Sequence, residues 1–265
     1  MTRDLRCTSD LFQTGVVHLD KAAVFLELLP VLAAMRLSRA LPVALRLVAL
    51  VYALWFLQDC VMWWLADAGR NNLWISHIAL PVTTGLLMWA FSLWQEDGVA
   101  RMAFRIAIPL YVLVWLFLLW RVERLDHFST YASPLACLLL ICMAAYTLVT
   151  ASLRSRETVW RQEWLWIGSG FLLYYGGEVV LMPLSNILFA AHRELHFVYQ
   201  LFGALGILST LLVTWGILCA PSHSISADLT GSGARGGSLL MAKELDWQRS
   251  ARAGDILETR DDGSR

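Results

Sequence analysis

Several polar or ionisable side chains stand within otherwise apolar stretches of this sequence. Asp59, His77, Glu178, His196 and Gln200 are the candidates for a shared site, whereas packing is the favoured role for Glu27. A charged side chain at the centre of a bilayer costs about 2.5–3.5 kcal/mol on insertion scales, so such residues face a bundle interior, pair with one another or change protonation state. Carboxyl and imidazole groups at one depth can form an ion pair, share a proton or hold a polar ligand. We therefore predict that these five residues form a ligand or proton pocket.

Long apolar runs, separated by short charged connectors, supply the elements that position these residues. The chain is 58% hydrophobic and only 16% charged, and several of its 13 Trp stand at the ends of apolar runs, as in the aromatic belts of membrane proteins. About 20 helical residues span the hydrocarbon core of a bilayer. We predict an all-α, polytopic transmembrane bundle of seven helices, at residues 16–35, 42–65, 73–94, 103–120, 131–152, 164–188 and 196–219.

An odd number of spans places the two ends of the chain on opposite sides of the membrane. The connectors after the first, third and fifth spans carry eight Arg, against seven Lys or Arg on the other side. Because Lys and Arg favour the cytoplasmic side, we predict a multi-pass inner-membrane protein with its N-terminus out and its C-terminus in. The predicted domains are an N-terminal segment (1–15), a transmembrane domain (16–219) and a flexible cytoplasmic tail (220–265).

Helix geometry brings four of the candidate residues to one end of the predicted bundle. At a rise of 1.5 Å per residue, Glu178 lies about 21 Å from the cytoplasmic start of its helix, and Asp59 lies at a similar height. His77 and His196 stand near the starts of helices that begin at the opposite face. We therefore expect these four side chains in the outer third of the bundle. Either histidine could pair with Glu178, or Asp59 could share a proton with it.

Two alternatives stay open for these residues. A buried carboxyl group is often hydrogen-bonded to Trp, Tyr or a backbone carbonyl and then serves packing alone. In addition, His192 and His196 form an H-x-x-x-H motif, and residues four apart on a helix share a face and can bind one metal ion. Arg193 occupies the position at which zincin-type motifs have a Glu. The favoured prediction is non-enzymatic and includes no metal and no cofactor.

The charge pattern limits the classes of partner. The formal net charge is zero, so no basic footprint for nucleic acid is present. The only lysines are Lys21 and Lys243, so no later span offers an amine for a retinal Schiff base. The expected partner is the lipid bilayer, and the sequence indicates no particular protein partner.

Three short motifs of the chain resemble those of a group of bacterial seven-helix membrane proteins without an assigned activity. In that group the third helix starts with N-N-L-x-x-x-H-x-x-x-P, the sixth helix ends in S-N, and a His opens the seventh. The chain matches at Asn71, Asn72, Leu73, His77, Pro81, Ser185, Asn186 and His196. The resemblance implies a bacterial seven-helix fold and no particular chemistry.

A second resemblance is to the membrane hydrolases that include alkaline ceramidases and adiponectin-type receptors. Those proteins are similar in having seven helices, an Asp, and H-x-x-x-H in the last helix around zinc. The Ser-x-x-x-His of that family's early helix is missing here. The resemblance implies, as the alternative function, a zinc-dependent intramembrane lipid hydrolase with the metal held by Asp59, His77, His192 and His196.

Overall fold

Seven helices make up the part of the chain that the computed structural model describes, with no strand in that part. The described residues are 21–37, 41–123, 125, 129–154, 160, 162–190 and 196–220, with the backbone alone at 154, 182–190, 196, 197 and 199. The helices are α2 (Leu28–Arg36), α3 (Val43–Asp67), α4 (Leu73–Leu93), α5 (Gly98–Arg121), α6 (Ala132–Arg154), α7 (Glu163–Ala190) and α8 (His196–Cys219). The all-α prediction is confirmed for these residues. The predicted segment 1–15 and residues 221–265 of the predicted tail lie outside them.

Several of these helices are suited to a bilayer. Within the described residues, five are long and apolar enough to cross a membrane: Val43–Asp67, Leu73–Leu93, Gly98–Arg121, Ala132–Leu153 and Gln200–Cys219. Large apolar side chains also point outward, and on α5 Leu113 is 63% exposed and Phe117 58%. A contiguous apolar surface is a liability in water, whereas in a bilayer it is the surface that lipid tails contact. The structure therefore supports the predicted class of multi-pass membrane protein.

Local hydrogen bonds stabilise the connection between α3 and α4 at one end of the bundle and the start of α5 at the opposite end. α3 stops before Gly69, whose φ of +66° places it in the left-handed region that glycine adopts without steric cost. Asn72 Nδ2 then donates to the Met62 carbonyl oxygen at 3.0 Å, which joins the start of α4 to the end of α3. At the opposite side, Asp97 caps α5 by accepting a bond from the Val99 N–H at 3.1 Å, as N-cap residues do.

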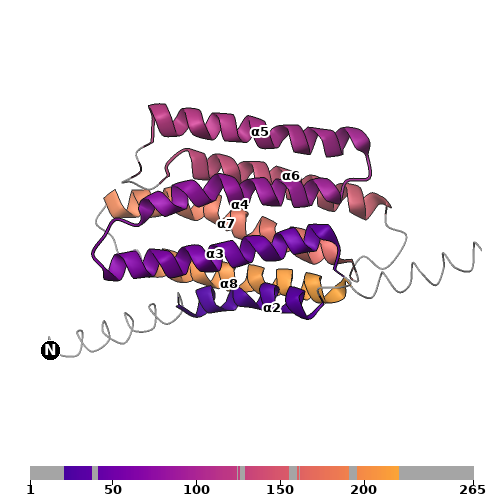
Figure 1. The fold of residues 1–265 in the computed structure, drawn as a ribbon, viewed down its shortest axis with the longest axis horizontal. Helices are drawn as coiled ribbons and strands as arrows, with labels where there is room; N and C mark the ends of the chain where they lie inside the picture. The colour runs from indigo at the N-terminus through magenta and orange to yellow at the C-terminus, as the bar shows by residue number, and fades with distance from the viewer. Residues whose placement is uncertain are drawn as a thin grey trace, which may run out of the picture. The chain divides into compact units, whose positions relative to one another are not determined.

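Six of the described helices form a closed ring, and α5 lies outside it (Figure 1). Contacts run from α2 to α3, α4, α6, α7 and α8 in turn, and α8 returns to α2. α5 packs mainly on α4, with a smaller contact to α6. Consecutive helices from α3 to α8 run in alternating directions. The starts of α4 and α6 therefore lie at the same end of the bundle as the ends of α3 and α7.

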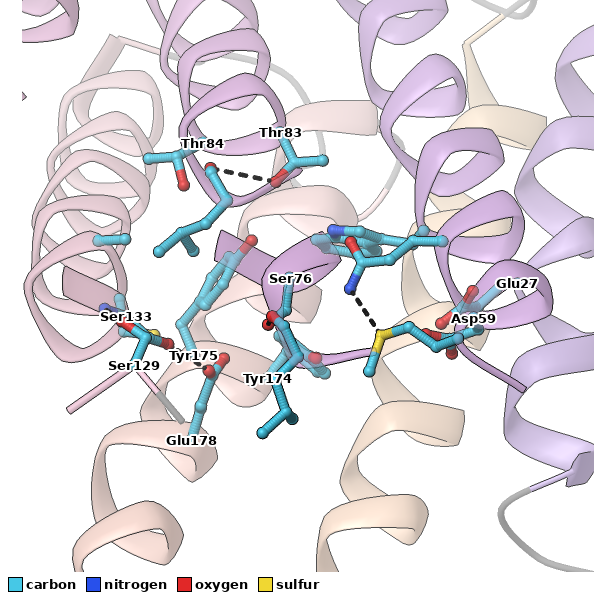
Figure 2. Close-up of a pocket in the computed structure, with 17 residues that line it drawn as sticks. Glu27, Asp59, Ser76, Thr83, Thr84, Ser129, Ser133, Tyr174, Tyr175 and Glu178 are labelled. Atoms are coloured by element: carbon cyan, nitrogen blue, oxygen red, sulfur yellow. Dashed lines mark hydrogen bonds between the residues drawn. The ribbon is translucent and has the colours of Figure 1, made fainter. Parts of the chain in front are cut away.

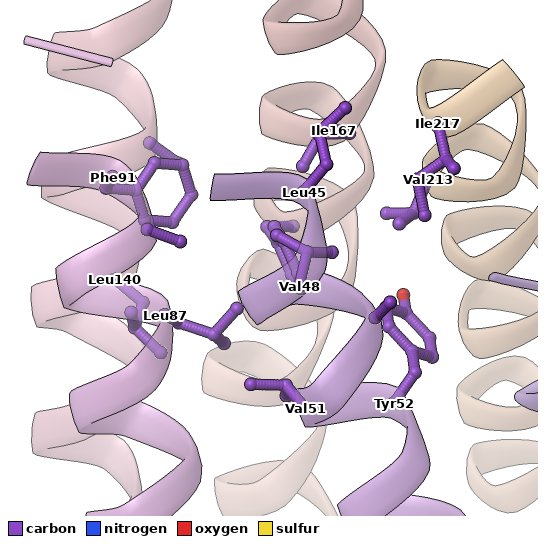
Figure 3. Packing of buried hydrophobic residues seen from close by; sticks show 14 of the residues in the cluster. Leu45, Val48, Val51, Tyr52, Leu87, Phe91, Leu140, Ile167, Val213 and Ile217 are labelled. Carbon is purple, nitrogen blue, oxygen red and sulfur yellow. The ribbon is translucent and has the colours of Figure 1, made fainter. Parts of the chain in front are cut away.

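Apolar side chains fill one half of the ring interior. Leu45, Val48, Leu87, Leu140 and Ile167 have no solvent-exposed surface, and Figure 3 shows them interdigitating between helices. The α7–α8 pair makes the most extensive helix contact. There the Ser209 hydroxyl donates to the Gly170 carbonyl oxygen at 2.8 Å, so the two backbones approach closely where α7 has no side chain.

We expect Gly170→Ala to lower the free energy of unfolding by about 1–3 kcal/mol, the usual cost of overpacking a well-filled interior. A Cβ at position 170 would lie 2.9 Å from Val213 Cγ2 and 3.0 Å from the Ser209 carbonyl oxygen. Gly176→Ala is the matched control on the same helix, because a Cβ there meets no described atom within 4 Å. Thermal or SDS-induced unfolding in detergent measures both. Equal stability of the two variants would contradict this packing.

Candidate functional site

A cavity of about 270 Å³ lies in the half of the ring that the apolar core leaves unfilled. Side chains of α3, α4, α6 and α7 surround it, together with residues just before α2 and α6 (Figure 2). The described residues that line it are Glu27, Trp55, Gln58, Asp59, Met62, Leu73, Ser76, Leu80, Thr83, Thr84, Ser129, Ser133, Ala136, Cys137, Tyr174, Tyr175 and Glu178. Carboxyl, hydroxyl and aromatic groups thus meet in one internal space.

Asp59 and Glu178, which we predicted to share a pocket, both line this cavity. They reach it from α3 and α7, which run in the same direction and place them at a similar depth. Glu27, for which the sequence favours a packing role, also lines the cavity and is beside Asp59 in Figure 2, whereas Glu178 is on the other side. No Lys, Arg or His is among the described lining residues. The acidic side chains therefore face one another across a space without a basic partner in its described wall.

Among the described side chains, a hydroxyl group donates a hydrogen bond to Glu178. Ser133, in the first turn of α6, donates from Oγ to Glu178 Oε1 at 3.0 Å. The sequence left His77, His196 and Asp59 open as partners of Glu178, and the spacing of residues within single helices does not indicate the serine. The bond exists because α6 packs against α7, a neighbour relation that a single helix pattern does not contain.

His77 lies next to Glu123 and is not among the residues lining the cavity. Its Nδ1 is 3.6 Å from Glu123 Oε2, and the two side chains are 0% and 3% exposed. Glu123 also accepts hydrogen bonds from the Tyr131 N–H at 2.7 Å, the Ala132 N–H at 2.9 Å and the Ser129 hydroxyl at 3.1 Å. One carboxylate thus connects α4 to the first residues of α6. The sequence gives no local signal for it, because Glu123 is too far from Ala132 for an ordinary helix cap.

The remaining predicted site residues do not extend the cavity. Gln200 is half-buried on α8 and does not line it. His192 and the side chain of His196 lie outside the described residues. Within the described residues no three His, Cys, Asp or Glu side chains are grouped to hold a metal ion. Since two of the four residues of the zinc alternative are not described, that alternative stays a prediction.

Aromatic rings close the inner end of the cavity. Trp55 and Tyr174 have ring centroids 5.7 Å apart, and Tyr174 lies 5.2 Å from Tyr175. One turn nearer the starts of α3 and α7, the ring centroids of Tyr52 and Phe171 lie 6.3 Å apart. These two rings belong to the apolar core. Offset and edge-to-face contacts of this kind stabilise buried aromatic clusters. The cavity therefore ends at a packed floor of rings.

Glu123→Ala is expected to destabilise the protein by about 1–3 kcal/mol, because the α6 N–H groups and the Ser129 hydroxyl lose their acceptor. Glu123→Gln keeps one acceptor oxygen, so we expect a smaller loss. The exposed Asp67, at the end of α3, provides the control Asp67→Ala. Thermal unfolding in detergent measures all three variants. If Glu123→Ala unfolds at the temperature of Asp67→Ala, Glu123 does not stabilise the start of α6.

No protein-family model, curated protein or solved structure matches the chain. The resemblance to bacterial seven-helix proteins and the fainter one to membrane hydrolases therefore stay predictions from short motifs. The functional interpretation that follows rests on the cavity and its lining.

Proposed function

We propose that the chain is a seven-span protein of the bacterial inner membrane whose cavity binds a small ligand or a proton without catalysing a reaction. The 28 residues of α7 are enough to cross a hydrocarbon core of about 30 Å, and we assign the seventh span to the first predicted segment, residues 16–35, whose described part includes most of α2. Arg36, Arg101 and Arg105 stand at helix ends opposite the cavity. Because Lys and Arg favour the cytoplasm, this arrangement supports an outward-side cavity, with the N-terminus out and the C-terminus in.

The observation that carries the proposal is a polar cavity above an apolar floor. A permeation path needs polar groups or water along its whole length, whereas here Phe91, Phe171 and Leu87 are almost completely buried beyond the rings. Ligand sites are concave spaces in which polar groups converge beside aromatic and apolar side chains, and this cavity combines carboxyl and hydroxyl groups with Trp55, Tyr174 and Tyr175. Binding from one side is therefore better supported than conduction across the membrane.

The presence of an unfilled cavity beside the carboxyl groups favours a binding role for them over a role in packing alone. A carboxyl group that serves packing alone is enclosed by partners that satisfy its oxygens. Glu27 Oε2 is inaccessible to solvent and has no hydrogen-bond partner among the described residues, and it belongs to the wall of a cavity. A proton on the Glu27 carboxyl group would give it a hydrogen-bond donor. The accessible part of the same side chain lines the cavity, which supports a binding role for this space.

Thiol labelling tests whether small molecules reach the cavity. The five native cysteines are first replaced with Ala: Cys7, Cys60, Cys137, Cys142 and Cys219. We expect a thiol introduced by Ser76→Cys to react with methyl methanethiosulfonate in membranes, because Ser76 lines the cavity. Ser92→Cys is the matched control on α4: both serine hydroxyls donate to the carbonyl three residues earlier at 2.7 Å, but Ser92 is 0% exposed in the packed half.

The control thiol should react only after the protein is unfolded in SDS. Equal protection of both thiols in the folded protein, with reaction of both in SDS, would contradict an accessible cavity. Mass spectrometry of the intact protein measures the extent of labelling in every case.

The same variant tests orientation. A membrane-impermeant, charged thiol reagent should modify the Ser76→Cys protein in intact spheroplasts and not in sealed inside-out vesicles, since the cavity end is placed outside. The reverse pattern would show that the bundle is inverted. A neutral permeant reagent, expected to react in both preparations, controls for the folded state.

A further inference from the structure

The cavity wall is acidic and lacks a described basic residue, and this indicates the charge of the molecule that it takes. This inference rests on the proposed binding function. Glu27, Asp59 and Glu178 come from three different segments and line the same space. Carboxyl groups withdrawn from water need a positive charge, a hydrogen-bond donor or a proton. None of the described side chains in the wall carries a positive charge, so the ligand is the natural source of one.

Glu27 and Asp59 form the first acidic end of the cavity. Figure 2 shows the two side chains next to each other on one side of the space. Glu27 is half-buried and lines the cavity, so a ligand reaches the accessible part of its side chain and not the covered Oε2, which has no hydrogen-bond partner among the described residues. The Gln58 amide, which also lines the cavity, donates to the sulfur of Met62 at 3.7 Å. An ammonium group has three N–H donors and can bond two adjacent carboxyl groups together.

Glu178 forms the second acidic end of the cavity, and aromatic rings lie between it and the Glu27–Asp59 end. Ser133 satisfies one of its oxygens at 3.0 Å. Tyr174 lies between Glu178 and the Glu27–Asp59 pair in Figure 2, and the Trp55 ring is 5.7 Å from the Tyr174 ring. Aromatic faces attract ammonium groups and the methylene groups attached to them. Separate acidic ends with an aromatic middle match a linear molecule with a cation at each end.

The size of the cavity excludes a lone ion as a good fit. One water molecule occupies about 30 Å³ in the liquid, whereas the cavity measures about 270 Å³. A bare inorganic cation would leave most of this volume and the aromatic wall without contact. A chain of several carbon atoms would contact both.

We propose that the cavity binds a short aliphatic diamine, with one ammonium group at Glu27 and Asp59 and the other at Glu178. The contacts are non-covalent, and the hydrocarbon chain lies against Trp55 and Tyr174. A ligand with a negative charge would meet like charge at both ends, and a neutral diol would supply hydrogen bonds but no charge.

Isothermal titration of the purified full-length protein in detergent tests this assignment. The compounds are 1,4-diaminobutane, butan-1-amine and butane-1,4-diol, which share a four-carbon chain and carry two, one and no positive charges. We expect the diamine to bind most tightly and the diol not to bind measurably. Asp59→Asn and Glu178→Gln should each weaken diamine binding at least about tenfold, because hydrogen bonds to charged groups contribute about 1.5–3 kcal/mol.

Two matched variants control for general effects of charge. Asp67→Asn repeats the α3 substitution and Glu163→Gln repeats the α7 substitution, and neither residue lines the cavity. Both should bind the diamine like the unaltered protein. Equal binding of diol and diamine, or unchanged affinity in Asp59→Asn and Glu178→Gln, would overturn the assignment. Butan-1-amine binding as tightly as the diamine would overturn the second ammonium position.

The labelling experiment separates this inference from the proposed function. If the thiol at position 76 reacts but no amine binds, the cavity is accessible and the assigned ligand class is wrong. If the thiol is protected and no amine binds, the proposed binding function fails as well. Protection of the Ser92→Cys thiol in the Asp59→Asn and Glu178→Gln backgrounds shows that each acid variant still folds, because Ser92 is 0% exposed in the packed half.

Discussion

Hydrocarbon cannot solvate a carboxyl group, and the arrangement of this protein depends on that constraint. Acids in apolar helices must turn toward protein, because every unsatisfied polar group in lipid is costly. A closed ring of helices provides an interior in which they can do so. Glu27, Asp59 and Glu178 accordingly point inward from three segments, while outward positions carry Leu, Phe and Trp. The cavity is thus a consequence of gathering polar groups at one end of the ring.

The two halves of the ring interior differ in what fills them. In one half, branched aliphatic and aromatic side chains are packed without exposed surface, as in the close-packed interiors of other proteins. In the other half, short hydroxyl side chains such as Ser76, Thr83 and Ser133 leave volume that no side chain occupies. The rings of Trp55 and Tyr174 mark the boundary. The packed apolar half can therefore hold the cavity walls of the polar half in place.

Glu123 gives the cavity end of the ring a fixed connection. It bonds the first residues of α6 and lies against His77 of α4. Ser129 and Ser133, on either side of the start of α6, both line the cavity. The position of the Ser133 hydroxyl group, which donates to Glu178, therefore depends on Glu123, a carboxylate outside the cavity. A substitution of Glu123 would shift the start of α6 and with it this part of the cavity wall.

The sequence by itself determined the helices and the depth of the acids. The described helices α3 to α8 begin and end within five residues of the predicted spans, because long apolar runs and charged connectors define them. The constant rise per residue of an α-helix was enough to place Asp59 and Glu178 at a similar depth and so in one cavity. Neighbour relations around the ring were decided only in three dimensions. Helices that are apolar on nearly every side do not specify which face meets which partner, so the sequence did not indicate that Ser133 would reach Glu178, that His77 would face Glu123, or that Glu27 would join Asp59.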